Sequence, residues 1–253
     1  MIANFKEIEA NYEDFLIKEE KPRKGDFCSN WSLANSLMKE KSPISSLDNI
    51  SDTKEVNRGY RKFKRIIDIF GATSLLIGFS PLIILTAILV KLTSRGAVIF
   101  KQERLTLGNK TFTMYKFRSM QVNAEANSGA TWASVKDVRT TPIGRFIRLT
   151  RLDELPQLIN VLDGSMSLIG PRPERPEIAE ELKKELPGFE RRLEVKAGLS
   201  GLAQVSSGYA SCIESYRKKL AYDIFYVDNL SFGLDLRIAL RTVIVMLTGS
   251  GAR

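Results

Sequence analysis

The feature that most constrains the fold is a run of 22 residues without formal charge, residues 69–90. As one helix this run would be about 33 Å long, enough to cross a bilayer core of about 30 Å. Pro81 lies in the middle of the run and removes a helix hydrogen bond, and Ser80 beside it offers the freed backbone a local partner. The sequence therefore predicts a membrane helix that is broken at Ser80 and Pro81.

Positive charge flanks this run at both ends, with Lys64 and Arg65 before it and Lys91 and Arg95 after it. Such clusters favour the cytoplasmic face of a membrane. If both flanks are cytoplasmic, the chain must enter the membrane and return, because each arm has only about 10–12 residues, too few to span alone. We expect a re-entrant helix. A spanning helix and a buried helix of a soluble protein are the alternatives.

Charge is divided unevenly along the chain. Residues 1–57 contain 8 Lys and Arg against 11 Asp and Glu, whereas residues 58–253 contain 30 against 18. The basic part suits anionic lipid headgroups and phosphorylated ligands. It would also suit nucleic acid, but the long apolar run does not fit a nucleic-acid-binding module, so no nucleic acid is expected. We predict a polar N-terminal extension over 1–57, a basic flank with the re-entrant helix over 58–95, and a cytoplasmic catalytic domain over 96–253.

Two residue types restrict the chemistry. The chain has no histidine, which excludes Ser-His-Asp triads, histidine acid–base catalysis and zinc sites that need imidazole. Its two cysteines, Cys28 and Cys212, are far apart and lack the paired spacing of a zinc site, so reduced cytosolic thiols are expected. The first 40 residues contain no apolar segment typical of a signal peptide, and none is predicted.

The remaining pattern predicts an α+β fold, a mostly helical catalytic domain with a small β-hairpin. Two strands, 97–105 and 110–120, are joined by a Gly-Asn turn. A helix capped by Thr141 follows, and the next helix is expected to begin at Asp153 or Glu154 and to end at Gly164. Further helices are expected over 177–186, 213–227 and 234–247, and the last two have the mixed basic and apolar composition of amphipathic interfacial helices.

Two adjacent carboxylates, Asp153 and Glu154, stand between arginines. Arg148 precedes them, and Arg172 and Arg175 follow in a proline-rich loop. Alone, such a pair of carboxylates is more often a charge at a helix N-terminus than a catalytic group. A carboxylate nucleophile would nevertheless suit a site without histidine, because it is already ionised at neutral pH. At a helix N-terminus it would also lie beside backbone amides that favour phosphate. A stiff loop lowers the entropy cost of holding a guanidinium on a phosphate.

Five stretches give the chain a resemblance to a known family. They are Lys64-Arg-Ile-Ile-Asp with the Ser80-Pro81 segment; Tyr115-Lys-Phe-Arg-Ser-Met; Leu152-Asp-Glu-Leu-Pro-Gln-Leu with Asp163-Gly-Ser-Met-Ser-Leu-Ile-Gly-Pro-Arg-Pro; Gly198-Leu-Ser-Gly-Leu-Ala-Gln-Val; and Tyr222-Asp-Ile-Phe-Tyr-Val. Over about 58–250 the sequence resembles the bacterial sugar transferases, the monotopic phosphoglycosyl transferases. We expect none of the extra N-terminal membrane helices of larger members, and Lys196-Ala-Gly stands where Lys-Pro-Gly is usual, a change that we expect to be neutral.

The resemblance implies transfer of a sugar-1-phosphate from a UDP-sugar to polyprenyl (undecaprenyl) phosphate, with release of UMP and use of Mg²⁺. It implies a covalent phospho-sugar intermediate on Asp153, at the cytoplasmic face of the bacterial inner membrane. This would be the first membrane step of surface glycan assembly (exopolysaccharide, capsule, O-antigen or glycoprotein glycan). The alternative is a catalytically silent membrane adaptor of the same fold.

The expected residue roles follow from these motifs. Asp153, Glu154 and Arg148 are the catalytic candidates, and Asp153 and Glu154 are also the candidates for holding magnesium. The substrate-binding candidates are Lys116, Arg118, Arg172, Arg175 and Gln204; a solvated strand face remains the alternative for the first two, and a structural role for the last. Ser80, Pro81, Lys64 and Arg65 are the membrane candidates, with Asp68 expected to pair with one of these two cations. Loops 121–140 and 206–215 are expected to select the sugar, and homo-oligomerisation is left open.

Overall fold

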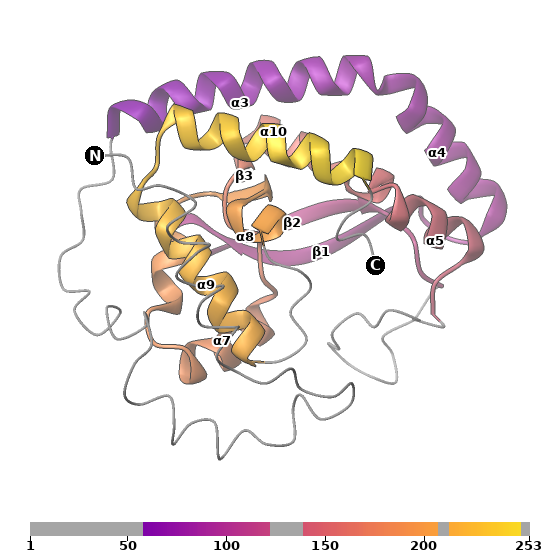
Figure 1. Cartoon of the computed structure of the whole chain (residues 1–253). Helices are drawn as coiled ribbons and strands as arrows, with labels where there is room; N and C mark the ends of the chain where they lie inside the picture. The colour runs from indigo at the N-terminus through magenta and orange to yellow at the C-terminus, as the bar shows by residue number, and fades with distance from the viewer. Residues whose placement is uncertain (1–57, 122–138, 207–212, 249–253) are drawn as a thin grey trace. The chain divides into compact units, whose positions relative to one another are not determined.

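The computed structural model describes residues 58–121, 139–206 and 213–248, all within one unit of the chain, Leu47–Arg253. The predictions for 1–57, for both cysteines and for 122–138 and 207–212 of the two specificity loops lie outside these residues. The described part is mostly helical with two small sheets, which confirms the α+β fold class (Figure 1). The longer elements are α3 (Arg58–Gly78), α4 (Ser80–Thr93), β1 (Ile99–Thr106), β2 (Lys110–Phe117), α5 (Pro142–Leu149), α7 (Pro176–Glu185), α9 (Ile213–Asp228) and α10 (Phe232–Thr248). The shorter ones are η2 (Leu107–Asn109), η3 (Leu152–Glu154), α6 (Gln157–Asp163), β3 (Met166–Ile169), η4 (Phe189–Glu194), β4 (Ala197–Ser200) and α8 (Leu202–Ser206).

The predicted helix break lies between α3 and α4, which meet at an angle of 63°. Pro81 is in the first turn of α4, where a missing N–H leaves no helix bond unmade. The carbonyl of Ile77 lies one turn before Pro81, and Ser80 Oγ donates to it at 2.7 Å. The hydroxyl therefore satisfies the acceptor that the proline cannot reach, and the prediction of a break at these two residues is confirmed.

Neither arm of this bent pair is long and apolar enough by itself to cross a bilayer, and no other described helix is; the two arms meet that criterion only together. Large apolar side chains along both arms are exposed: Phe70 to 71 %, Ile77 to 70 % and Leu92 to 79 %. Exposure of this extent is unfavourable in water and typical of a surface that contacts another apolar medium or partner. The bent geometry fits a re-entrant segment, and its insertion in a membrane stays a prediction.

The first half of α3 packs against the rest of the protein. Arg65 donates to the carbonyls of Val161 and Leu162 at 2.5 and 2.7 Å, at the C-terminal end of α6, where helix carbonyls lack partners. Lys64 Nζ lies 2.6 Å from Asp235 Oδ2 of α10. Both cations therefore have acceptors within the protein, and their role as headgroup anchors stays a prediction.

Asp68 does not pair with either cation as expected. Its Oδ1 accepts from Ser167 Oγ and from the backbone N–H of Leu168, both at 3.0 Å. Because Lys64 and Arg65 are held elsewhere, the buried carboxylate joins α3 to β3 instead. α3 also contacts α6, and the predicted boundary near residue 95 stays a prediction.

Two sheets of two strands occur among the described residues. β1 and β2 form the predicted antiparallel hairpin, with Ile99 opposite Phe117, and its turn has positive φ at Gly108 and Asn109. β3 and β4 form a short parallel pair that the sequence did not predict. With four residues each, they are too short to produce a readable alternation.

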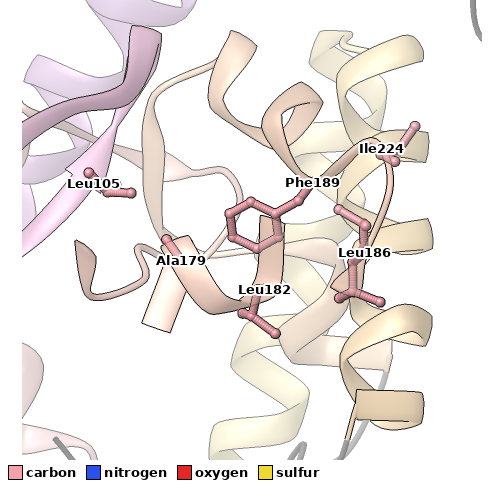
Figure 2. Close-up of a cluster of buried hydrophobic side chains, with 7 residues drawn as sticks. Leu105, Ala179, Leu182, Leu186, Phe189 and Ile224 are labelled. Atoms are coloured by element: carbon pink, nitrogen blue, oxygen red, sulfur yellow. The ribbon is translucent and has the colours of Figure 1, made fainter. Parts of the chain in front are cut away.

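The helices differ in what they expose. α9 buries Leu220 and Ile224 in an apolar cluster with β1, α7 and η4, seen in Figure 2. This cluster consists of Leu105, Ala179, Leu182, Leu186, Phe189, Leu220 and Ile224. α10 has the opposite character, with seven exposed large apolar residues: Phe232, Leu236, Leu240, Val243, Ile244, Met246 and Leu247. Of the two helices predicted to be interfacial, α10 exposes an apolar surface, whereas Leu220 and Ile224 of α9 pack against α7 and η4. Contact of either helix with a membrane stays a prediction.

Pro81→Ala tests the origin of the bend. The new backbone N–H can donate to Ile77 O, so we expect the α3–α4 angle to open and the segment to span the membrane; an interior proline costs a helix about 3 kcal/mol. Single cysteines placed at Lys62 and Arg95, in a chain with Cys28 and Cys212 replaced by serine, would be labelled with a membrane-impermeant reagent. In the parent, neither cysteine should react with reagent added on the outer side of the membrane. In the variant, one of the two should become accessible to it.

Ser80→Ala is the matched control, because it removes the hydroxyl and keeps the proline; the protection of both cysteines should persist. Labelling of one cysteine from outside in the parent itself would contradict a re-entrant segment.

Candidate active site

Asp153 and Glu154 lie in the short 3₁₀ helix η3, and α6 begins only at Gln157. The prediction of a helix beginning at either carboxylate was therefore wrong. In a helix beginning at Asp153 the residue at 156 would donate its N–H to Leu152 O, and Pro156 has no N–H. Leu155 N donates to Leu152 O instead, at 3.3 Å, which tightens the turn. Asp153 thus precedes α6 and is not in the first turn of that helix, where the helix dipole would act on it most strongly.

Three segments meet at the carboxylate of Glu154. Lys116 Nζ of β2 lies 2.9 Å from Glu154 Oε1, and Arg172 Nη2, from the loop after β3, lies 2.7 Å from the same oxygen. Lys116 is therefore at the carboxylate pair and not on a solvated strand face. The structure brings together three of the predicted residues around one charged centre.

The pKa values of the two adjacent carboxylates are shifted in opposite directions. Burial, followed by repulsion from Glu154, raises the pKa of Asp153 to about 6, although nearby Lys116, Arg172 and Arg148 act in the other direction. Burial would also raise the pKa of Glu154, but the contacts with Arg172 and Lys116 outweigh it and hold that pKa well below its usual range. At neutral pH Glu154 is a fixed anion between cations, and Asp153 is an ionised carboxylate that is more basic than usual. Such a pairing is typical of sites with divided roles.

Arg148 and Arg175 differ in their contacts. Arg148 is half-buried on α5, and its charge acts to lower the pKa of Asp153, as expected of a cation beside that carboxylate. Arg175 is the residue before α7, and its Nε lies 3.6 Å from Glu177 Oε2. The predicted roles of both arginines toward substrate stay predictions.

Two further candidates are held by the fold. Arg118 is buried, and its Nη2 donates to Ser94 O and Oγ at 2.8 Å, which joins β2 to the end of α4. Gln204 Nε2 donates to Leu199 O at 3.2 Å, while its Oε1 is buried without a hydrogen-bond partner in the described part of the chain. These contacts give both residues a structural function, and substrate binding by either stays a prediction.

The sequence did not reveal how the loop that carries Arg172 is held. Pro171 and Pro173 have no backbone N–H, so the loop depends on donors from elsewhere. Its four successive carbonyls all accept such bonds: Pro171 O from Gly198 N at 2.8 Å, Arg172 O from Arg192 Nη2 at 2.7 Å, Pro173 O from Arg104 Nη1 at 3.0 Å and Glu174 O from Leu105 N at 2.9 Å. Neither Arg104 nor Arg192 was a candidate, because no local motif marks them.

The carboxylates suit one kind of metal site. Among the described residues no group of three or more Asp, Glu, His or Cys side chains could hold an ion. Glu154 Oε1 already accepts from two cations, which leaves Asp153 as the more available ligand. Magnesium is usually bound by one or two carboxylates with substrate phosphates and water. The site fits a magnesium ion that arrives with a diphosphate and contacts Asp153, and does not fit an ion enclosed by protein alone.

Replacing each carboxylate by its amide should change stability in opposite directions. The pKa of folded Asp153, about 6, exceeds its ordinary 3.8, so the stabilisation of its protonated form is complete below about pH 4 and lost as pH rises through 6. Asp153→Asn should therefore raise the free energy of unfolding at pH 7.5 by roughly 2 kcal/mol, less toward pH 4.

Glu154→Gln should lower the same quantity by about 3 kcal/mol at pH 7.5, because Lys116 and Arg172 lose their buried counter-charge. The pKa of folded Glu154 is depressed, so its stabilisation is present at neutral pH and lost only in acid. Thermal unfolding in detergent from pH 4.5 to 8 measures both variants, and shifts of equal sign at pH 7.5 would contradict the assignment.

Comparison with known proteins gives a consistent picture. A model of the bacterial sugar transferase family matches residues 59–249. A UDP-N-acetylgalactosamine-undecaprenyl-phosphate N-acetylgalactosaminephosphotransferase of Aeromonas hydrophila is 46% identical over 194 residues, which cover 77% of this chain and 46% of the relative. A UDP-glucose:undecaprenyl-phosphate glucose-1-phosphate transferase of Klebsiella pneumoniae is 41% identical, with 72% and 39% covered. The chain thus spans less than half the length of these two relatives.

A further relative is matched over most of its own length. It is a UDP-glucose:undecaprenyl-phosphate glucose-1-phosphate transferase of Caulobacter vibrioides, 39% identical over 191 residues, which cover 75% of this chain and 71% of the relative. Since the family model extends from α3 to the end of α10, the match includes the bent helix pair, the carboxylate site and the loop that carries Arg172. The chain belongs to the bacterial sugar transferase family.

Proposed function

We propose that this protein transfers a sugar-1-phosphate from a UDP-sugar to undecaprenyl phosphate and releases UMP. The observation that carries the proposal is the buried Asp153 with its raised pKa, beside Glu154 held by Lys116 and Arg172. A basic carboxylate next to cations suits attack on a phosphoryl group. The relatives named as UDP-sugar:undecaprenyl-phosphate transferases support the substrate class.

The first step joins donor and protein. An oxygen of Asp153 forms a bond to the β-phosphorus of the UDP-sugar, and the bond from that phosphorus to the bridging oxygen breaks, so that UMP leaves with the electron pair. Anion attacks anion, so positive charge around the phosphoryl group is the main requirement. Arg148, Lys116 and Arg172 supply it in this site.

The second step transfers the phospho-sugar to the lipid and regenerates the free carboxylate of Asp153. An oxygen of undecaprenyl phosphate forms a bond to the same phosphorus, and the bond to Asp153 breaks. Neither step requires a base to remove a proton, because both nucleophiles are already anions, which suits a chain without histidine. Bound magnesium would neutralise part of the diphosphate charge. Glu154 keeps Lys116 and Arg172 in place and does not itself react.

The bent pair α3–α4 suits delivery of a lipid acceptor. We infer that it enters the cytoplasmic leaflet and returns, and that α10 lies in the membrane surface. The beginning of α10 is joined to the beginning of α3 by Tyr60 and Lys64, which both lie 2.6 Å from Asp235 Oδ2; both helices are seen in Figure 1. The exposed apolar faces of α3, α4 and α10 support one membrane-contacting surface. An adaptor without catalysis would have no need of the costly buried charges at Asp153 and Glu154.

UMP release tests the reaction. Protein in detergent would be supplied with undecaprenyl phosphate, Mg²⁺ and a panel of UDP-sugars that differ in the hexose. We expect release with at least one donor, loss with EDTA, and a decrease of at least about 100-fold in Asp153→Asn, because the amide cannot act as the nucleophile.

Glu180→Gln is the control, since this exposed carboxylate on α7 pairs with Lys183 of the same helix at 2.8 Å. It should keep the wild-type rate. Release by Asp153→Asn at the wild-type rate would overturn the role of Asp153, and silence with every donor would count against the reaction.

A further inference from the structure

Two neighbouring arginines of η4 form ion pairs with α9, and the pairs differ in depth. Arg191 pairs with Asp228, whose side chain is 30% exposed. Arg192 Nη2 lies 2.8 Å from Asp223 Oδ2, and the two side chains are 6% and 4% exposed. The chain thus contains an outer and an inner pair that join the same two elements.

Only the inner pair continues toward the active site. Arg192 Nη2 also donates to the backbone carbonyl of Arg172 at 2.7 Å, and its Nη1 lies 3.7 Å from Glu174 Oε1. The side chain of Arg172 in turn reaches Glu154 Oε1 at 2.7 Å. A continuous series of contacts therefore leads from Asp223 on α9 through Arg192 and Arg172 to Glu154.

Stability alone is a weak reason for such a pair. Removing two charges from water is costly, and replacing a buried ion pair by apolar residues of similar size is often neutral or stabilising. The cost is visible at Asp223, where burial raises the pKa to about 6 despite the contact with Arg192. A planar guanidinium fork does, however, fix the direction of two acceptors at once, which an apolar contact cannot do.

The loop after β3 depends on a donor that fixes the direction of its carbonyls. Two of its four residues from Pro171 to Glu174 are prolines, and at Arg172 the carbonyl accepts a hydrogen bond from Arg192 Nη2 at 2.7 Å. Rotation of this peptide would move the guanidinium of Arg172 away from Glu154. A displacement of about 1 Å from a distant change can lower turnover by about 100-fold.

We propose that Arg192, held by Asp223, is a positioning residue that fixes the backbone of Arg172 and thereby the cation at Glu154 and Asp153. Arg192 touches neither carboxylate of the catalytic pair, so it acts through Arg172. The inference rests on the proposed function and adds a second layer of residues that it requires.

The test compares the two arginines. Arg191→Met and Arg192→Met each remove one arginine that joins η4 to α9, and only the second removes the contact with Arg172. We expect UMP release by Arg191→Met within about twofold of wild type and a decrease of about 10- to 100-fold in kcat/KM for Arg192→Met. The acid limb of the pH profile should move to higher pH, because Arg172 then lowers the pKa of Asp153 less.

A double variant separates positioning from stability. Arg192→Met with Asp223→Leu removes both charges and leaves an apolar contact, so the melting temperature should return to the wild-type value or exceed it. Activity and the acid limb should remain as in Arg192→Met. Recovery of both together with stability would overturn the proposal and leave the pair a purely structural role.

A binding measurement makes the outcome independent of turnover. Calorimetric titration with UDP and Mg²⁺ should show weaker affinity in the double variant than in Arg191→Met, because the cation at Glu154 is misplaced. Equal affinities would overturn the positioning role. Absence of UMP release from wild type as well would instead count against the proposed reaction.

Discussion

The contact of Glu154 with two cations is the interaction on which the site depends. Lys116 from the hairpin and Arg172 from the loop after β3 share one oxygen of this carboxylate, and each reaches it from a different part of the chain. A carboxylate without these partners would be too costly to bury, and the cations would be equally costly without it. The triad therefore joins three segments and fixes positive charge beside Asp153, whose own carboxylate remains basic.

This arrangement divides the work of two adjacent residues. Glu154 holds the cations in place, and Asp153 is buried and more basic than an ordinary carboxylate, as the proposed bond to phosphorus requires. The 3₁₀ turn is what allows the division, because it separates the pair from the dipole of α6, which would otherwise stabilise the anion and weaken it as a nucleophile. The absence of histidine is consistent with a reaction in which both nucleophiles are already ionised.

The helix that begins the described chain serves both the site and the surface. Its first half is fixed to α6 by Arg65, to α10 by Lys64 and to β3 by Asp68, and its second half carries exposed apolar residues toward the break at Pro81. This anchoring gives the proposed membrane segment a fixed relation to α6 and therefore to the carboxylates that precede it. Such a relation is what an enzyme needs if one substrate is soluble and the other lies in a bilayer.

The sequence predicted those features that depend on local chemistry. The break at Ser80 and Pro81, the Gly-Asn hairpin and the Thr141 cap each follow from a few adjacent residues, and all are present. The resemblance also led to Asp153, Glu154, Lys116 and Arg172, which the structure brings together. The start of α6 was missed because the lost N–H of Pro156 changes the helix type in a way that periodicity does not show. Arg192, Arg104 and the β3–β4 pair were missed because their partners are distant in the chain.

Intact-protein mass spectrometry tests the central claim most directly. The purified enzyme would be mixed with its UDP-sugar and Mg²⁺ in the absence of undecaprenyl phosphate and analysed before and after addition of that acceptor. The account predicts a mass increase equal to one phospho-sugar, located by fragmentation at Asp153, absent from Asp153→Asn and removed by the acceptor. An active enzyme that stays unmodified, or a phospho-sugar attached to any other residue, would contradict it.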